Sequence, residues 1–171
     1  MSVLHKSTKR DYLERVNDPD FPKARAAKLA KQWGYDYWDG DRRINYGGYK
    51  YIEGRWEKVA REMLDHYRLP ENPKILDVGC GKGFLLFDFL KVMPNSEIYG
   101  IDISKYRIAN SKEEIRDSLQ VGKATDLPWP DNYFDLVVCF RFLDGQISYR
   151  DTIKVIVEFC RVSRKNLILE L

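Results

Sequence analysis

The stretch KILDVGCGKGF, residues 74–84, has the residue types and the spacing of a small-ligand site. Its apolar start predicts a buried strand over Lys74–Val78, with Asp77 near the end, and Phe84–Val92 reads as the following helix. Between them stand three glycines at alternate positions, 79, 81 and 83. Glycine adopts left-handed backbone conformations and carries no Cβ, so a ligand can lie against the main chain and the helix N-terminus. The sequence therefore predicts a cofactor at this turn.

The spacing within the turn argues against two phosphate-binding motifs. A dinucleotide-binding G-x-G-x-x-G needs a third glycine where Phe84 stands. A P-loop needs a glycine where Leu76 stands, and Ser or Thr after Lys82, where Gly83 stands. The Asp77 carboxylate would also repel an anion and attract a cationic amine. The turn therefore favours a cofactor that carries an amine.

A second carboxylate follows at a distance that suits a ribose. The residues Glu97–Ile101 predict another strand, which is followed directly by Asp102. In nucleotide-binding folds, a carboxylate about 20 residues after the glycine turn accepts hydrogen bonds from ribose hydroxyls. The alternative is that Asp102 caps a helix beginning near Lys105, since Asp is common at helix N-caps.

A third pattern, VGKATDLPWPDNYFD, occupies residues 121–135 and precedes a predicted strand over Leu136–Phe140. Together the three patterns, over about residues 70–171, resemble the class I S-adenosylmethionine-dependent methyltransferases, whose glycine turn faces the amino acid part of the cofactor. The family form of the third pattern is G-D-A-x-x-L-P-F-P-x-x-x-F-D. One position departs from it, because Lys123 stands where many members carry an acid that contacts the adenine amino group. A charged lysine cannot accept that hydrogen bond.

The resemblance implies S-adenosylmethionine as the cofactor and S-adenosylhomocysteine as the product. It assigns Ile103 to pack on the adenine, and leaves the adenine amino group to the Ala124 backbone, to Asp126, or to no residue. Arg55, which precedes a predicted helix over residues 56–67, is our candidate partner for the methionine carboxylate. The predicted cofactor-binding residues are Asp77, Gly79, Cys80, Gly81, Gly83, Asp102, Ile103, Ala124, Asp126 and Arg55.

The stretch Trp33–Trp56 is rich in aromatic rings, with eight Trp or Tyr and five Gly among its 24 residues. Such a stretch suits ligand recognition, although a packed loop with a small core of its own is the alternative. It resembles the front end of an uncharacterised methyltransferase subgroup, and in the family this segment carries part of the substrate pocket. We therefore predict substrate contacts from Tyr46, Tyr49, Arg42 and Arg43, the two arginines binding an acidic substrate.

The end of the fourth predicted strand should also meet the methyl acceptor, because ligands of open α/β sheets lie beyond the carboxyl ends of the strands. This reasoning places Phe140 and Arg141 in the substrate site. Asp144 is the candidate catalytic residue, a general base for a hydroxyl acceptor. The alternative is that Asp144 and Gly145 only form a turn.

The order of elements predicts the fold. Further helices are expected over residues 105–117 and 149–163, and further strands over 119–121 and 166–171. This alternation predicts an α/β, doubly wound, mainly parallel sheet of the Rossmann-like methyltransferase type. We expect a single domain, with residues 1–56 as a helical, aromatic-rich N-terminal cap segment and 57–171 as the cofactor-binding core.

The family usually adds an antiparallel hairpin after the fifth strand, and this chain ends at that strand. Without the hairpin an apolar strand edge would be exposed, which proteins normally cover. A shortened chain, a compact member of the family, and a homodimer or another partner that covers the edge are the alternatives.

Composition limits the remaining classes. The net charge is +3, and the basic residues near the N-terminus read as a solvated helix that begins near Lys23, so we expect no nucleic-acid partner. Three cysteines and two histidines show no metal-ligand spacing, and all three cysteines are expected to be buried thiols. A polar start and the lack of a run of about 20 apolar residues predict a cytoplasmic protein without a membrane span.

We therefore predict transfer of a methyl group from S-adenosylmethionine to a small-molecule acceptor. The alternative is an inactive methyltransferase-fold subunit with a binding or regulatory role, which Lys123 and the short C-terminus favour. A nicotinamide-dependent dehydrogenase is a more distant alternative.

Overall fold

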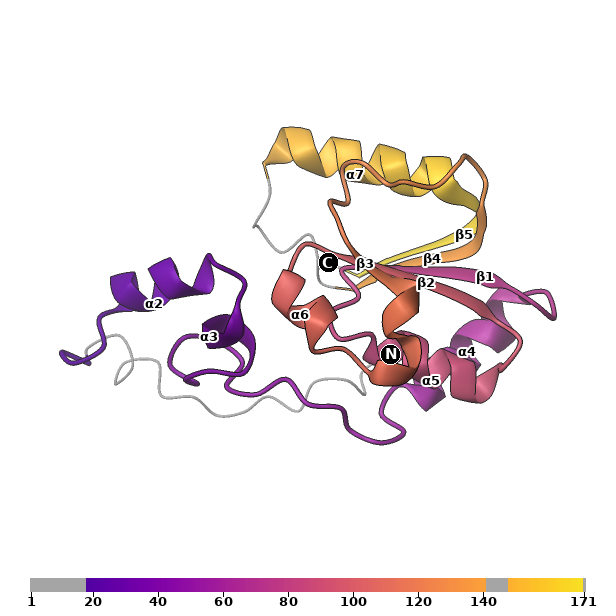
Figure 1. Ribbon diagram of the computed structural model, residues 1–171. Coiled ribbons are helices and arrows are strands. Elements are labelled where there is room, and N and C mark those ends of the chain that lie inside the picture. The colour runs from indigo at the N-terminus through magenta and orange to yellow at the C-terminus, as the bar shows by residue number, and fades with distance from the viewer. Residues whose placement is uncertain (1–17, 141–147, 171) are drawn as a thin grey trace. The chain divides into compact units, whose positions relative to one another are not determined.

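The computed structural model describes residues 18–140 and 148–170 (Figure 1). The chain divides into two compact units, residues 1–50 and 51–171, which are described separately. The division at residue 56 that the sequence suggests stays a prediction.

The second unit is built on a five-stranded sheet in the order β3-β2-β1-β4-β5. Every strand pair in it is parallel, which confirms the predicted α/β, doubly wound fold. The strands are β1 (Lys74–Val78), β2 (Glu97–Asp102), β3 (Leu119–Val121), β4 (Phe134–Phe140) and β5 (Ser163–Glu170).

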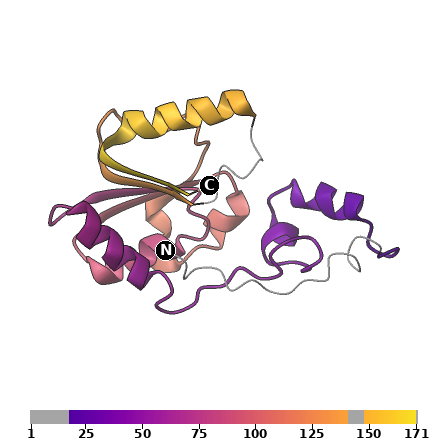
Figure 2. The same cartoon turned by 180° about the vertical axis from the view of Figure 1, so that it is seen from behind.

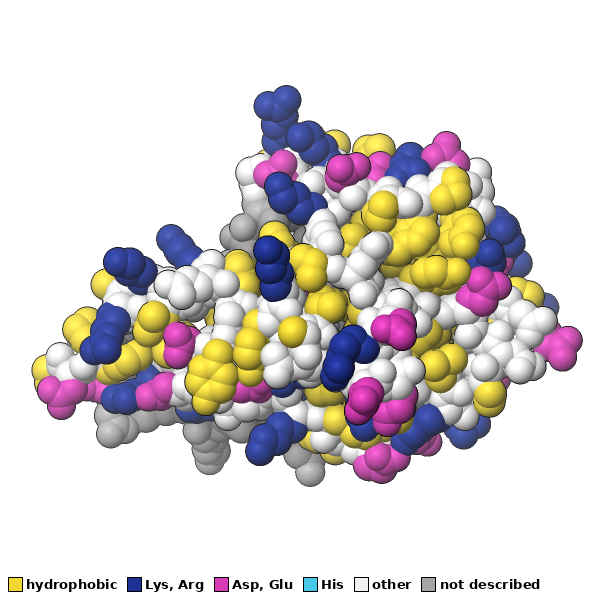
Figure 3. Space-filling view, in the orientation of Figure 1, with side chains coloured by type: hydrophobic (Ala, Val, Ile, Leu, Met, Phe, Trp, Pro, Cys, Tyr) yellow, Lys and Arg dark blue, Asp and Glu magenta, His cyan; other side chains and the backbone are white. Residues whose placement is uncertain are grey.

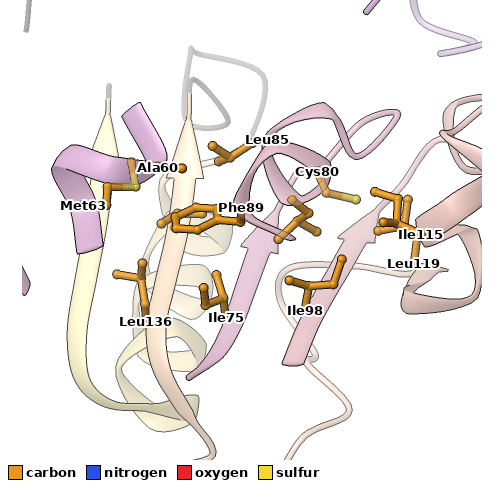
Figure 4. Packing of buried hydrophobic residues seen from close by; sticks show 12 residues of the cluster. Ala60, Met63, Ile75, Cys80, Leu85, Phe89, Ile98, Ile115, Leu119 and Leu136 are labelled. Carbon is orange, nitrogen blue, oxygen red and sulfur yellow. The ribbon is translucent and has the colours of Figure 1, made fainter. Parts of the chain in front are cut away.

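Helices cover both faces of this sheet. On one face lie α4 (Glu57–Tyr67) and α5 (Phe84–Val92), and on the other lies α7 (Tyr149–Val162), as the two opposite views show (Figures 1 and 2). Figure 4 shows side chains from α4, α5 and the strands meeting around Phe89, which is fully buried. Because the central strands are covered on both sides, their sequences are nearly continuous apolar runs.

The parallel register sets the position of the glycine turn. Asp77 of β1 lies opposite Gly100 of β2, and Val78 lies opposite Ile101. The carboxyl ends of β1 and β2 therefore meet at one edge of the sheet. The two carboxylates that the sequence singles out, Asp77 and Asp102, stand at these ends.

The predicted helix over residues 105–117 is wrong in its length. The structure has a short α6 (Lys105–Ala109) and then a separate 3₁₀ helix, η1 (Glu113–Ser118). Asn110 ends α6, and its side-chain amide donates to the Tyr106 carbonyl oxygen at 2.8 Å. Asn and Ser side chains compete with the backbone for such bonds and so favour helix ends. Asn110 and Ser111 therefore break the expected helix.

The cysteine prediction holds for two residues and fails for one. Cys80 and Cys139 are buried, but Cys160 is exposed. On α7 the neighbouring Phe159 is fully buried against the sheet, so Cys160 faces outward. The same outer face carries the exposed side chains of Ile153 and Val157.

A buried carboxylate holds the first residues of the second unit in place. Asp88 of α5 is fully buried, and it accepts hydrogen bonds from the Tyr51 hydroxyl and from the Trp56 backbone N–H, the latter at 2.9 Å. Burial and the bond to Asp88 raise the pKa of Tyr51. Asp88 thus fixes both ends of the segment that leads into α4.

The first unit contains α2 (Lys23–Ala30) and α3 (Tyr35–Trp38). Around α3, aromatic rings pack on one another with centroids 4.4–6.2 Å apart, and Trp38 is only 4% exposed. The contacting rings are Trp33, Tyr37, Trp38, Tyr46 and Tyr49. The aromatic stretch therefore forms a small core of its own, as the packed-loop alternative predicts.

The basic side chains of α2 are exposed to solvent. Lys23, Arg25 and Lys28 all lie on the surface, and basic and acidic side chains are interspersed over the visible face (Figure 3). Within residues 18–140 and 148–170, no helix is long and apolar enough to cross a lipid bilayer.

Candidate functional site

The glycine turn has the backbone that its sequence predicts. Gly79, Gly81 and Gly83 have φ angles of 81°, 63° and 74°, all in the left-handed region. The backbone N–H of Gly79 donates to the Ile101 carbonyl at 2.8 Å, which ties the turn to β2. A Cβ on Gly83 would lie 2.5 Å from the Ile115 side chain. The backbone conformation therefore favours glycine at all three positions, space adds to this at Gly83, and α5 begins directly after the turn.

Asp102 holds the turn from the end of β2. It is 4% exposed, and its Oδ2 accepts the Gly81 backbone N–H at 2.9 Å. Its Oδ1 accepts the Ser104 N–H at 2.8 Å. The helix cap is Ser104 itself, whose Oγ accepts the Arg107 N–H at 3.3 Å. Asp102 therefore supports the turn, and the alternative that it caps the helix does not describe the structure.

Asp77 is a second buried acid at this edge, 5% exposed. Burial raises the pKa of Asp77 to about 7, the nearby Arg107 acts in the opposite direction, and Asp102 raises it further. A carboxyl group in this state is divided between its two protonation forms near neutral pH. An approaching cation would favour the ionised form.

Arg107 of α6 completes the charged group, and the sequence reasoning missed it. Its Nη1 lies 3.0 Å from Asp102 Oδ2, and its side chain is 14% exposed. An arginine five residues after an aspartate is an ordinary surface pattern, so the sequence gives no signal for this pair. Only the packing of α6 against the turn brings the two together.

A hollow of about 280 Å³ opens beside the carboxyl ends of β1 and β2. It contains the predicted residues Gly79, Asp102, Ile103 and Ala124, and Ile103 is 53% exposed although apolar. The sequence missed Asp151 and Val155, which reach the hollow from α7. The full lining is Val78, Gly79, Ile101, Asp102, Ile103, Gly122, Lys123, Ala124, Thr125, Asp151 and Val155.

Other predicted residues lie away from this lining. Asp126 is exposed, and its N–H closes a turn to the Lys123 carbonyl. Arg55 is exposed in the turn before α4. Phe140 is half-buried at the end of β4, with its ring 5.9 Å from that of Trp56. Their binding roles stay predictions, and the predicted Arg141 and Asp144 lie outside the described residues.

The four predicted substrate residues of the first unit are engaged within that unit. Tyr46 and Tyr49 belong to the ring cluster, and Arg42 donates to the Tyr46 carbonyl. Arg43 pairs with Asp41 at 2.6 Å and lies over the Phe21 ring at 4.5 Å. The Arg43 side chain lowers the pKa of Asp41 by hydrogen bonding. An acidic substrate would have to compete with Asp41 for Arg43.

The chemistry of this edge is that of binding. Buried carboxylates beside the glycine turn can accept hydrogen bonds from hydroxyl groups and pair with a cation. Burial raises the pKa of the Cys80 thiol, so it is held as a thiol and not as a nucleophilic thiolate. Within the described part of the chain, no group of three His, Cys, Asp or Glu side chains could hold a metal ion. The donor set fits a ligand with a diol, an apolar ring and an amine.

The chain is similar to known proteins. The family model named methyltransferase domain matches residues 69–170. A demethylmenaquinone methyltransferase of Symbiobacterium thermophilum is 41% identical in an alignment 90 positions long, which covers 48% of this chain and 36% of that protein. Erythromycin 3''-O-methyltransferase of Saccharopolyspora erythraea is 28% identical in an alignment 155 positions long, which covers 80% of this chain and 50% of that protein.

Among solved structures, a SAM-dependent methyltransferase from Aquifex aeolicus matches with a TM-score of 0.55 and 24% identity. The match covers 70% of this chain and 68% of that one. At this identity the likeness shows the fold alone. The chain spans about a third to a half of the length of the two curated relatives.

Proposed function

Because the chain belongs to the methyltransferase domain family, we propose that it binds S-adenosylmethionine and transfers the methyl group to a small-molecule acceptor. The observation that carries the proposal is the glycine turn, which follows the buried Asp77 and is held by the buried Asp102, beside a hollow lined by both apolar and charged side chains. Two relatives whose names give demethylmenaquinone and erythromycin as acceptors support a small molecule.

In this proposal each part of the cofactor has its own partner in the protein. Asp102 accepts the ribose hydroxyls, and Ile103 and Ala124, which also line the hollow, pack on the adenine. Asp77, next to the turn, would pair with the amine of the methionine part. When bound, S-adenosylmethionine supplies a methyl group on a positively charged sulfur. The protein has to hold the acceptor in line with that group and exclude water.

Asp77 would couple binding to a proton. With a pKa of about 7 in the free protein, Asp77 is partly protonated at neutral pH. A cationic amine beside the carboxyl group stabilises the ionised form. Binding of the cofactor would then release a fraction of a proton from Asp77.

On the acceptor side, Phe140, Arg141 and Asp144 stay our candidates from the sequence, with Asp144 as the base for a hydroxyl acceptor. We place the protein in the cytoplasm. At the end of the described sheet, β5 pairs with β4 alone, so we propose that a second copy or another partner covers its free edge. Light scattering of the purified chain would test this assembly.

Two observations favour a second function. Arg107 already pairs with the carboxylate that would receive the ribose, and Lys123 lines the hollow where the family carries an acid. A methyltransferase-fold subunit with a binding or regulatory role would tolerate both. Formation of a methylated product separates the two functions.

The first experiment is calorimetric titration with S-adenosylhomocysteine on the wild type and on Asp102→Ala. We expect micromolar binding that this substitution weakens about ten-fold or more, the effect of one charge-assisted hydrogen bond. Asp65→Ala, which removes an exposed acid of α4, should bind like the wild type.

Thermal melting of each variant establishes that the protein is folded, and Asp102→Asn replaces Asp102→Ala if the latter is not. A folded wild type that does not bind would contradict the proposed cofactor. Equal binding by the wild type and both Asp102 variants would contradict the assigned site.

A further inference from the structure

Arg107 lies on the open side of Gly81. A Cβ built on Gly81 would lie 2.0 Å from Arg107 Nη2, 2.6 Å from Cζ and 2.7 Å from Nε. The guanidinium group therefore rests directly on the main chain of the glycine. Gly81 has no side chain of its own, and Arg107 covers the main-chain surface that is left there.

Arg107 also takes up acceptor positions on Asp102. A carboxylate has about four lone-pair positions on its two oxygens. Three of them are directed to the Gly81 N–H, the Ser104 N–H and the Arg107 guanidinium. A ribose diol needs two acceptor positions, so one of these contacts must be given up. The two backbone bonds hold the turn and the start of α6, and the bond from the long Arg107 side chain is the one that can leave without moving the backbone.

The charges around the turn also indicate that Arg107 leaves when a cofactor binds. Asp77 and Asp102 are both at least nine-tenths buried near one another, and buried like charges repel. Arg107 offsets this repulsion in the free protein. A cofactor that brings its own cationic groups to the same place makes the arginine charge unnecessary there, and two cations at one site repel each other.

We propose that Arg107 is a displaceable internal counter-ion, which covers Gly81 and pairs with Asp102 until a cationic, diol-bearing cofactor takes its place. This inference rests on the proposed function, since it concerns the same cofactor site. Arg107 is then a positioning residue, which holds Asp102 and the glycine turn while no cofactor is bound. The inference predicts that Arg107 weakens cofactor binding and stabilises the protein without cofactor.

The test compares Arg107→Met with the wild type. We expect Arg107→Met to bind S-adenosylhomocysteine about five- to ten-fold more tightly, because the ligand no longer displaces an ion pair. Its melting temperature without ligand should be lower, and the rise in melting temperature on adding ligand should be larger. Lys105→Met is the matched control, because it removes one positive charge from an exposed position of the same helix, and it should change neither quantity.

A second readout follows the arginine itself. The Nε–H resonance of Arg107, identified as the peak missing in Arg107→Met, should shift on addition of S-adenosylhomocysteine toward the position of a solvent-exposed arginine. If Arg107→Met does not fold, Arg107→Gln takes its place in the affinity and melting measurements. Glutamine keeps a hydrogen-bond donor and loses the charge.

Each other result has a definite meaning. Weaker binding by Arg107→Met would show that the arginine donates to the bound cofactor, and unchanged binding with lower stability would show a purely structural role. Either result overturns the inference and leaves the proposed function intact. Failure of the wild type and of all variants to bind would overturn both.

Discussion

The two ends of the sheet use their charged residues in different ways. At the carboxyl end, Asp77 and Asp102 are buried next to a glycine turn and share the charge of Arg107. Asp77 has its pKa raised to about 7 because burial disfavours its ionised form. Its ionisation therefore works against folding.

At the amino end of the strands, acids and bases are matched. Asp135 accepts the Lys74 backbone N–H and the Arg164 guanidinium, each at 2.9 Å. Arg161 of α7 pairs with Glu158 and donates to the backbone carbonyls of the 127–129 loop. The bond from Arg161 lowers the pKa of Glu158. These charges stabilise the fold.

The contrast separates polar residues that serve stability from those that serve a ligand. A buried acid that lowers stability when ionised is kept where something other than folding uses it. Substitutions at the two ends should therefore separate into those that change ligand binding and those that change stability alone.

The largest effect on stability is expected from Gly83→Ala in the turn. The new Cβ would meet Ile115 at 2.5 Å and Leu119 at 2.9 Å, in a backbone with φ of 74°. We expect a loss of about 3 kcal/mol in the free energy of unfolding, measured with urea. Gly54→Ala is the matched control, since its φ is 68° and a Cβ there meets nothing within 4 Å. It should lose only about 1 kcal/mol, and equal losses would show that the space at Gly83 does not matter.

Asp77→Asn should change the pH dependence of stability. The pKa of Asp77 is about 7 in the folded protein against 3.8 for an ordinary aspartate. Between these values the folded state holds one more proton than the unfolded state, so the free energy of unfolding falls as pH rises. From pH 5 to pH 8 the wild type should lose about 2 to 3 kcal/mol that Asp77→Asn keeps. The measurement is urea unfolding of the wild type, of Asp77→Asn and of the control Asp65→Asn at the two pH values. The control should lose as much stability as the wild type. An equal loss in the wild type and in Asp77→Asn would contradict the prediction.

Arg161→Met tests the other end of the sheet. It removes the pair with Glu158 and the bonds to the Leu127 and Trp129 carbonyls. We expect about 2 kcal/mol of destabilisation and unchanged affinity for S-adenosylhomocysteine. Arg150→Met, at an exposed position of α7, should leave both unchanged. A marked loss of affinity in Arg161→Met would mean that the two ends are not independent.

The smallest effect is expected at Glu97, which is half exposed. Its carboxylate lies 3.5 Å from Lys74 Nζ and accepts the Tyr99 hydroxyl at 3.0 Å. Exposed pairs of this kind contribute little, so Glu97→Gln should change the free energy of unfolding by less than about 0.5 kcal/mol. A loss several times larger in thermal or urea unfolding would show that this pair belongs to a cooperative network.

The sequence predicted the sheet because its strands carry local signals. Apolar runs ending in Asp77 and in Asp102, with glycines between them, specify strand, turn and helix within about 30 residues. The helix over 105–117 was predicted too long because its helical pattern continues through Asn110 and Ser111, whose side chains compete for backbone bonds. Helix length there depends on that competition.

The candidate site was predictable where residues adjoin the strand ends, and not where distant elements meet. Asp102 ends β2, Ile103 follows it and Ala124 comes shortly after β3, and all three line the hollow. Arg107 reaches Gly81 across 26 positions, and Asp151 comes from α7. Such contacts depend on how helices pack, which residue spacing alone does not specify. The aromatic stretch allowed two interpretations, ligand recognition and a packed loop. A stretch whose rings contact a ligand and one whose rings pack on each other have the same amino-acid composition.

Asp88 fastens the start of the second unit to α5, the helix that begins at the glycine turn. The Tyr51 hydroxyl and the Trp56 backbone N–H both donate to its carboxylate, and Lys91 of the same helix pairs with Glu53. The segment between the tyrosine and the tryptophan is therefore bound to α5 at several points. Because one carboxylate receives both donors, a single substitution at Asp88 would release both ends of this segment at once.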